Sequence, residues 1–109
     1  MMWRVVYLPE AKKDFTSLAG NQQILVAKAI EKVRRNPLPV SEGGYGKPLG
    51  SKSDSRLTGF LKIKLRDAGL RVVYKLVKTD SEMLIVVIGT RADNEVYGIT
   101  ERRSEKYNL

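Results

Sequence analysis

Two neighbouring segments in which apolar and basic residues alternate constrain the fold of this chain more than any other feature of its sequence. Within residues 60–66, Leu61, Ile63 and Leu65 are each followed by a lysine or arginine. A period of two indicates a β-strand with one buried face. Residues 71–76 continue the alternation after the turn-forming Asp-Ala-Gly at 67–69. With the unbroken apolar run 83–88, typical of a strand covered on both faces, the sequence predicts three consecutive antiparallel strands.

The apolar pattern also predicts how the first two of these strands pair. Placing both apolar sets on one face pairs Leu65 with Val72 and puts Arg71 opposite Arg66, diagonal to Lys64. A slip of one residue would bury Arg71, which is costly. The opposite face should then carry one basic patch, whose members are Lys62, Lys64, Arg66, Arg71 and Lys75.

A basic strand face is most often only a solvent-exposed surface. Two features favour a ligand here. All five charges have the same sign, whereas ordinary surfaces mix signs. Like charges on neighbouring strands also repel each other, so an anionic ligand would relieve the repulsion.

The first third of the chain has helical patterns after one short strand. Residues 2–8 are rich in β-branched and aromatic residues and predict a strand. Pro9 suits the start of a helix that should end near Gly20, and Asn21 is a candidate N-cap for a second helix. That helix has an apolar stripe at 26, 30 and 33 and should end at 36–37, where a proline follows.

These patterns together predict an α+β fold. Its elements are an N-terminal strand, a two-helix hairpin and three antiparallel strands, which form a curved four-stranded sheet. Residues 37–56 are rich in proline, glycine and serine and predict a long surface loop. We expect residues 1–109 to form a single domain, in which 100–109 are a polar C-terminal tail.

Composition restricts the chemistry available to this chain. Its 20 lysines and arginines against 12 acidic residues give a net charge of +8, which favours polyanionic partners such as nucleic acids. There is no cysteine and no histidine, so disulfides, thiolate sites and histidine-dependent metal sites and hydrolases are excluded. Acid–base chemistry would have to use lysine, tyrosine or carboxylates. No run of about 20 apolar residues predicts a membrane span, and we expect a cytoplasmic protein that binds no membrane.

Three motifs resemble one known family. The run 62–66 followed by 69–74 (Lys-Ile-Lys-Leu-Arg, then Gly-Leu-Arg-Val-Val-Tyr) looks like the central hairpin of RelE-type toxins from type II toxin–antitoxin modules, within the RelE/ParE superfamily. The segment 87–91 followed by 95–97 resembles the strand end and C-terminal turn of that family. Residues 47–50 resemble the loop before the hairpin. The resemblance covers almost the whole chain and implies a RelE-like fold.

The resemblance implies a metal-independent endoribonuclease with no cofactor that cleaves messenger RNA on the ribosome. The ribose 2′-hydroxyl attacks the adjacent phosphate, and translation is inhibited. Lys62 and Arg71 would stabilise the charge on the phosphate, and Lys64 would be the general base. Arg91 would assist the departing 5′-oxygen, and Tyr97 would stack on or orient a base. Further RNA contacts are expected from Arg66, Lys75 and Lys47.

The family also implies partners and leaves alternatives open. We expect a RelB-like antitoxin, messenger RNA and the ribosome as partners, and operator DNA through the antitoxin complex. A ParE-like toxin that inhibits gyrase without nuclease activity is one alternative, and a non-catalytic nucleic-acid-binding module is another. Each of two site residues also has a purely structural alternative. Tyr97 could pack its ring at the domain edge without contacting RNA, and Arg91 could form an ion pair with Asp93 or Glu95.

Overall fold

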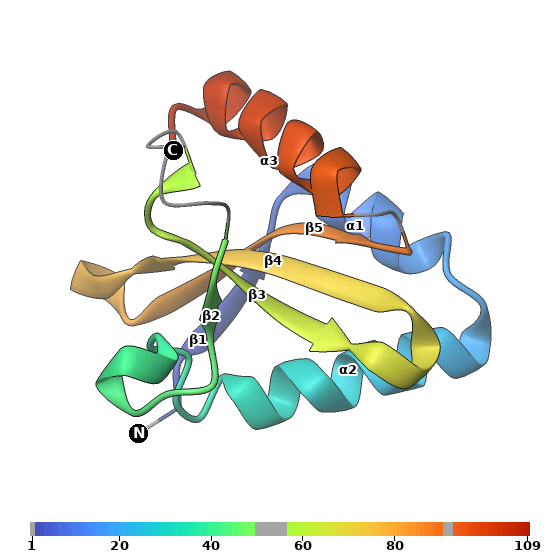
Figure 1. Ribbon diagram of the computed structural model, residues 1–109, viewed down its shortest axis with the longest axis horizontal. Helices are drawn as coiled ribbons and strands as arrows, with labels where there is room; N and C mark the ends of the chain where they lie inside the picture. Colours follow the sequence, from blue (N-terminus) through green and yellow to red (C-terminus); the bar gives the residue numbers. More distant parts are fainter. Residues whose placement is uncertain (1, 50–56, 91–92) are drawn as a thin grey trace.

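A twisted five-stranded sheet with helices on both of its faces organises the chain (Figure 1). The computed structural model describes residues 2–49, 57–90 and 93–109. The elements are β1 (Arg4–Tyr7), α1 (Pro9–Thr16), α2 (Gly20–Val33), β2 (Lys47–Pro48), β3 (Phe60–Leu65), β4 (Leu70–Val77), β5 (Glu82–Gly89) and α3 (Asp93–Tyr107). The α+β class predicted from the sequence is confirmed.

The sheet has one strand more than the four predicted. Its order is β1-β5-β4-β3-β2, and β2 is a two-residue strand at the edge. The segment from β3 to β5 is antiparallel as predicted, whereas β1 runs parallel to β5. Short strands such as β2 are difficult to predict because two residues show no periodicity. The extra strand brings the loop after α2 into the sheet.

The two helices after β1 differ from the prediction at their junction. Gly20 begins α2 instead of closing α1, and Asn21 lies inside the helix. The N-cap is Ala19, whose backbone N–H donates to the Gln22 side chain at 3.2 Å. The predicted stripe at 26, 30 and 33 is buried, and it packs on the sheet face that Ile63 shares.

The sequence left open whether the polar C-terminal segment 100–109 is helical, and the structure shows that α3 extends to Tyr107. Val96 and Thr100 lie one turn apart on this helix and are both buried. Val73, opposite Lys62 on β4, is also buried, although the sequence pattern predicted it on the solvent face between Arg71 and Lys75. The basic face of the sheet is therefore partly covered by α3 (Figure 1).

The C-terminal half of α3 is tied to the rest of the fold by charged groups. Arg103 donates to both carboxylate oxygens of Asp14 on α1, at 2.7 and 3.2 Å, and to the Val86 carbonyl at 2.8 Å. Asp14 also accepts the backbone N–H of Ile88 at 3.0 Å. These two side chains therefore satisfy backbone groups of β5 beyond the point where β1 has ended.

No helix in the described part of the chain has the length and apolar character needed to cross a membrane.

Candidate RNA-binding site

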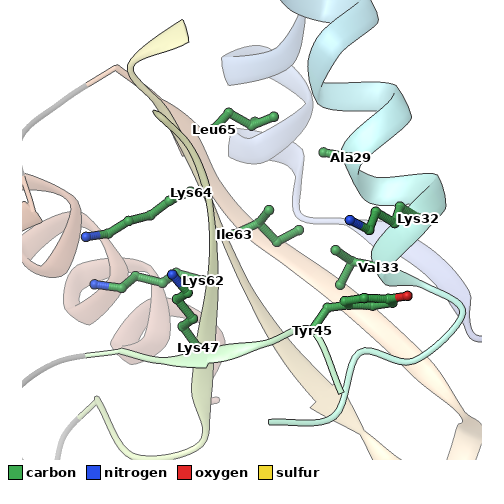
Figure 2. Close-up of a pocket in the computed structure, with 9 residues that line it drawn as sticks. All are labelled: Ala29, Lys32, Val33, Tyr45, Lys47, Lys62, Ile63, Lys64 and Leu65. Atoms are coloured by element: carbon green, nitrogen blue, oxygen red, sulfur yellow. The ribbon is translucent and has the colours of Figure 1, made fainter. Parts of the chain in front are cut away.

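The strand β3 divides its side chains between the two faces of the sheet (Figure 2). Lys62 and Lys64 point toward α3, and Ile63 and Leu65 point toward α2. This alternation follows from the pleat of the strand, and the apolar pair faces the stripe of α2. The sequence-predicted faces of β3 are therefore confirmed.

The register of the β3–β4 hairpin differs from the prediction by two residues. Leu65 pairs with Leu70, so Arg71 lies directly opposite Lys64 and not opposite Arg66. The turn explains the difference, because residues 66–68 form a 3₁₀ turn and Gly69 adopts a left-handed conformation (φ +66°). A shift of two residues keeps every side chain on its predicted face. The correction therefore brings Lys64 and Arg71 closer together than expected.

Lys62 meets Tyr97 on this same face. The Lys62 ammonium donates a hydrogen bond of 2.8 Å to the Tyr97 hydroxyl and lies 5.3 Å from the centre of its ring. The two residues are 35 positions apart and are brought together by the packing of α3 on the sheet. A side chain from β3 and one from α3 are thus held in one cluster, as a shared site requires.

The row of paired residues that contains Lys64 and Arg71 continues into β5. Arg71 pairs with Lys64 on one side and with Gly89 on the other. Arg91 follows Gly89 by two residues and lies outside the described residues. Gly89, the last residue of β5, therefore lies in the same row as Lys64 and Arg71.

The three residues expected to bind RNA outside the reacting centre have different positions. Lys47 is exposed on β2, directly opposite Lys62. Arg66 is exposed in the hairpin turn and lines a cavity of about 210 Å³ with Lys64 and Arg71. Lys75, the third of these residues, does not lie beside the Lys64–Arg71 pair.

Lys75 lies at the other end of the basic face. It pairs with Phe60, and its ammonium lies 5.2 Å from the centre of the Phe60 ring. Four residues of strand, roughly 13 Å, separate it from Arg71, and the buried Val73 lies between them. Lys75 is therefore diagonal to Lys62 but two rows away from the Lys64–Arg71 pair, and the buried Val73 interrupts the patch predicted from the sequence.

The loop before β2 is held against the sheet by one buried tyrosine. The Tyr74 hydroxyl donates to the Pro37 carbonyl at 2.8 Å, and burial raises the pKa of this tyrosine. Gly46 approaches so closely that a Cβ there would lie 2.3 Å from the Tyr74 oxygen. The contact fixes the chain on both sides of Tyr45 and so positions Lys47 beside Lys62.

Sequence reasoning missed two features near the site. Tyr45 lies in the segment predicted as an irregular loop, and only its position between two glycines marks it in the sequence. The Asp14–Arg103 pair joins residues 89 positions apart, so no local pattern could reveal it.

A second carboxylate of α1 forms hydrogen bonds with the last turn of α3. Glu10 accepts hydrogen bonds from Lys106 at 2.8 Å and from Tyr107 at 2.6 Å. The bond from Lys106, with that from Tyr107, lowers the pKa of Glu10 to about 2, and the same carboxylate raises the pKa of both partners. The helix that carries Tyr97 is thus attached to α1 at two successive turns.

Comparison with known proteins connects this chain with the RelE toxins. No family model matches the sequence. A curated Escherichia coli protein described as a RelE-like toxin protein is 27% identical over 103 residues, which cover 94% of this chain and 98% of that protein.

Solved structures give the same result for the fold. A variant of the E. coli toxin RelE in its free state matches with a TM-score of 0.73 and 20% identity, over 94% of this chain and 98% of that one. The toxin–antitoxin complex RelBE2 of Mycobacterium tuberculosis matches with a TM-score of 0.66 and 20% identity, over 84% and 100%. The intact E. coli RelBE complex matches with a TM-score of 0.65 and 18% identity, over 83% and 98%.

Proposed function

Since the fold of this chain matches that of RelE toxins and its sequence is similar to that of a RelE-like toxin, we propose that it is a RelE-family toxin of a toxin–antitoxin pair and that it cleaves messenger RNA on the ribosome. The observation that carries the nuclease proposal is the cluster on one sheet face. Lys64 lies directly opposite Arg71, and Lys62 is hydrogen-bonded to Tyr97 beside them. Cations held together in this way suit a phosphate better than a neutral ligand.

The reaction we propose needs only the RNA, water and these side chains. The 2′-hydroxyl attacks the adjacent phosphorus and its proton passes to the uncharged form of Lys64. The bond from phosphorus to the 5′-oxygen of the next nucleotide breaks, and that oxygen takes a proton from water. The products are a 2′,3′-cyclic phosphate and a 5′-hydroxyl. Lys62 and Arg71 offset the negative charge that builds on the phosphate oxygens, and Arg91 offsets the charge on the departing oxygen.

Tyr97 has two connected roles in this proposal. Its hydroxyl holds the Lys62 ammonium in the protein without substrate. A phosphate would attract that ammonium more strongly than a neutral phenol does. Lys62 would then move to the phosphate, and the Tyr97 ring would orient a base.

A ribosome-dependent reaction explains how so simple a site could be effective. No histidine is present in the chain to serve as a base near neutral pH. Positioning of the RNA by a partner can contribute several kcal/mol to lowering the barrier. We therefore propose that the ribosome aligns the attacking hydroxyl, and that the protein acts in the cytoplasm, where ribosomes and messenger RNA are found.

The partner of the toxin would be an acidic, RelB-like antitoxin. The charge of +8 supports such a partner, and the complex could bind operator DNA through the antitoxin. Antitoxin binding would inhibit the toxin by covering or distorting the basic face.

The experiment that tests the nuclease proposal compares Lys64→Ala and Arg71→Ala with Lys78→Ala, which changes an exposed lysine in the turn after β4. Primer extension on messenger RNA after induction should show in-frame cuts with the unchanged protein and with Lys78→Ala. The two site variants should lose the cuts and the growth arrest while circular dichroism stays unchanged. Full activity of both site variants would contradict the assignment.

Two other outcomes would point to the alternative functions. DNA breakage and an SOS response without cut messenger RNA would indicate a gyrase inhibitor. Steeply salt-dependent nucleic-acid binding without any cleavage would indicate a binding module.

A further inference from the structure

A cavity of about 280 Å³ lies beside the edge of β3, on the opposite side of the strand from the Lys62–Tyr97 contact (Figure 2). The strand β2 pairs only with Lys62 and Leu61, so β3 continues past it here. None of the nine lining residues carries a carboxylate. They are Ala29, Lys32, Val33, Tyr45, Lys47, Lys62, Ile63, Lys64 and Leu65.

The cavity combines an aromatic ring with cations. Tyr45 is 48% exposed, and the Lys32 ammonium lies 5.1 Å from the centre of its ring. Lys47 lies two residues farther along the chain and lines the same cavity. In sites for single-stranded nucleic acid, an exposed ring stacks on a base while nearby cations attract the phosphates.

The Tyr45 ring is attached to a well-anchored backbone. Its N–H donates to the Asn36 carbonyl at 3.0 Å, and the flanking Gly46 is packed against Tyr74. The Tyr74–Pro37 hydrogen bond anchors the same segment to the sheet. A ring held in this way loses little conformational freedom when a ligand stacks on it.

The cavity is continuous with the proposed catalytic cluster. Lys62 and Lys64 line it from β3 and extend toward α3, whereas Tyr45 lies on the side of α2 (Figure 2). A strand of RNA whose phosphate sits on these two lysines could therefore pass over the edge of β3. The next base along that strand would reach Tyr45.

We propose that this cavity binds one base of the single-stranded RNA substrate next to the cleaved phosphate, with the ring of Tyr45 as the stacking surface. Lys32 and Lys47 attract the flanking phosphates. The proposal rests on the RNA-cleaving function above and adds a second contact region to it. An acidic peptide is the competing ligand, but the aromatic ring and the continuity with Lys62 and Lys64 favour RNA.

The test measures binding of a short single-stranded RNA whose 2′-hydroxyls are all 2′-O-methylated, so that it cannot be cut. Fluorescence anisotropy at low ionic strength compares the unchanged protein with Tyr45→Ala and Tyr45→Phe. Val40→Ala is the matched control, because Val40 is an exposed residue of the same segment that does not line the cavity. Circular dichroism checks that each variant is folded.

Tyr45→Ala should weaken binding by about 5- to 150-fold, the range for loss of one base–aromatic stack. Tyr45→Phe keeps the ring and should bind nearly as tightly as the unchanged protein, as should Val40→Ala. A series of the same RNA with one abasic position at a time then locates the contact. At one position the abasic RNA should bind weakly to the unchanged protein, and Tyr45→Ala should cause no further loss.

Three results would overturn the proposal. The first is an unchanged affinity of Tyr45→Ala, and the second is an equal loss at every abasic position. The third is no RNA binding at low ionic strength. If Tyr45→Ala weakens binding of the purified cognate antitoxin but not of RNA, the cavity is a protein-docking surface and the proposal is also wrong.

Cleavage is assayed separately, so that the two proposals can fail independently. Coupling between Tyr45 and one RNA position in a protein that cuts no messenger RNA would refute the nuclease and retain the base-binding cavity. Cleavage by the unchanged protein without such coupling would refute the cavity alone.

Discussion

The pair formed by Arg103 and Asp14 should contribute strongly to the stability of the fold and to the placement of α3. Arg103 makes two hydrogen bonds to the Asp14 carboxylate and one to the Val86 carbonyl. The two side chains are only 16% and 13% exposed. We predict that Arg103→Met, which keeps most of the apolar stem, destabilises the protein substantially.

The magnitude follows from what the substitution leaves behind. Removing one member of a buried ion pair costs about 3–5 kcal/mol, because the other charge stays buried. Here Asp14 keeps the hydrogen bond from the Ile88 N–H and some contact with water, so we expect about 2–3 kcal/mol. The matched control is Arg4→Met. Arg4 is 68% exposed and makes one hydrogen bond, to a Glu82 that is itself 16% exposed, so its loss should cost about 1 kcal/mol, less than the loss of Arg103 with its three hydrogen bonds.

Urea denaturation followed by circular dichroism measures both values. Asp14→Asn and the double variant complete a cycle, in which the two single costs should add to more than the double. Hydrogen exchange should also increase along α3 in Arg103→Met and stay unchanged in Arg4→Met. Equal unfolding free energies for Arg103→Met and Arg4→Met would refute the reasoning, since the burial of Arg103 and its additional hydrogen bonds would then contribute nothing.

Two further predictions concern the supports of the site. Gly46→Ala should destabilise the protein by about 1–3 kcal/mol because its Cβ would collide with the Tyr74 oxygen. In the double variant, Tyr74→Phe should relieve part of that cost. Thermal denaturation of the two single variants and the double variant tests this, and an equal cost of Gly46→Ala with tyrosine or phenylalanine at position 74 would contradict it. The lowered pKa of Glu10 means that its stabilising contribution is complete above pH 4.5, the ordinary pKa, and is lost as the pH falls toward 2. Glu10→Gln should therefore flatten the acid side of the melting temperature against pH, and an unchanged profile would argue against the Lys106 and Tyr107 contacts.

The relation between sequence and site is clearest in the β3–β4 hairpin. The period of two assigned Lys62, Lys64 and Arg71 to one face, and the structure agrees. The same period could not distinguish registers that differ by two residues, because each of them preserves the faces. The turn determines the register, because Gly69 takes a left-handed conformation and Leu65 therefore pairs with Leu70.

The helix α3 is where local sequence was least informative. Its polar composition suggested a tail, yet Val96 and Thr100 supply a narrow buried face for the sheet. The packing of α3 on the sheet also brings Tyr97 to Lys62. None of these contacts leaves a periodic signal, because each joins segments that are far apart in the chain.

The sequence by itself determined the class of fold, the faces of the central strands, the strongly basic charge and the resemblance to RelE toxins. All of these depend on composition or on patterns within a few residues, where the geometry of a strand or helix dictates which side chains share a face. Only the tertiary structure decided the register of the hairpin, the Asp14–Arg103 pair that attaches α3, and the position of Tyr45 across the edge of β3 from Lys62 and Lys64. These features depend on how distant segments pack together, and packing selects among arrangements that the local patterns permit equally.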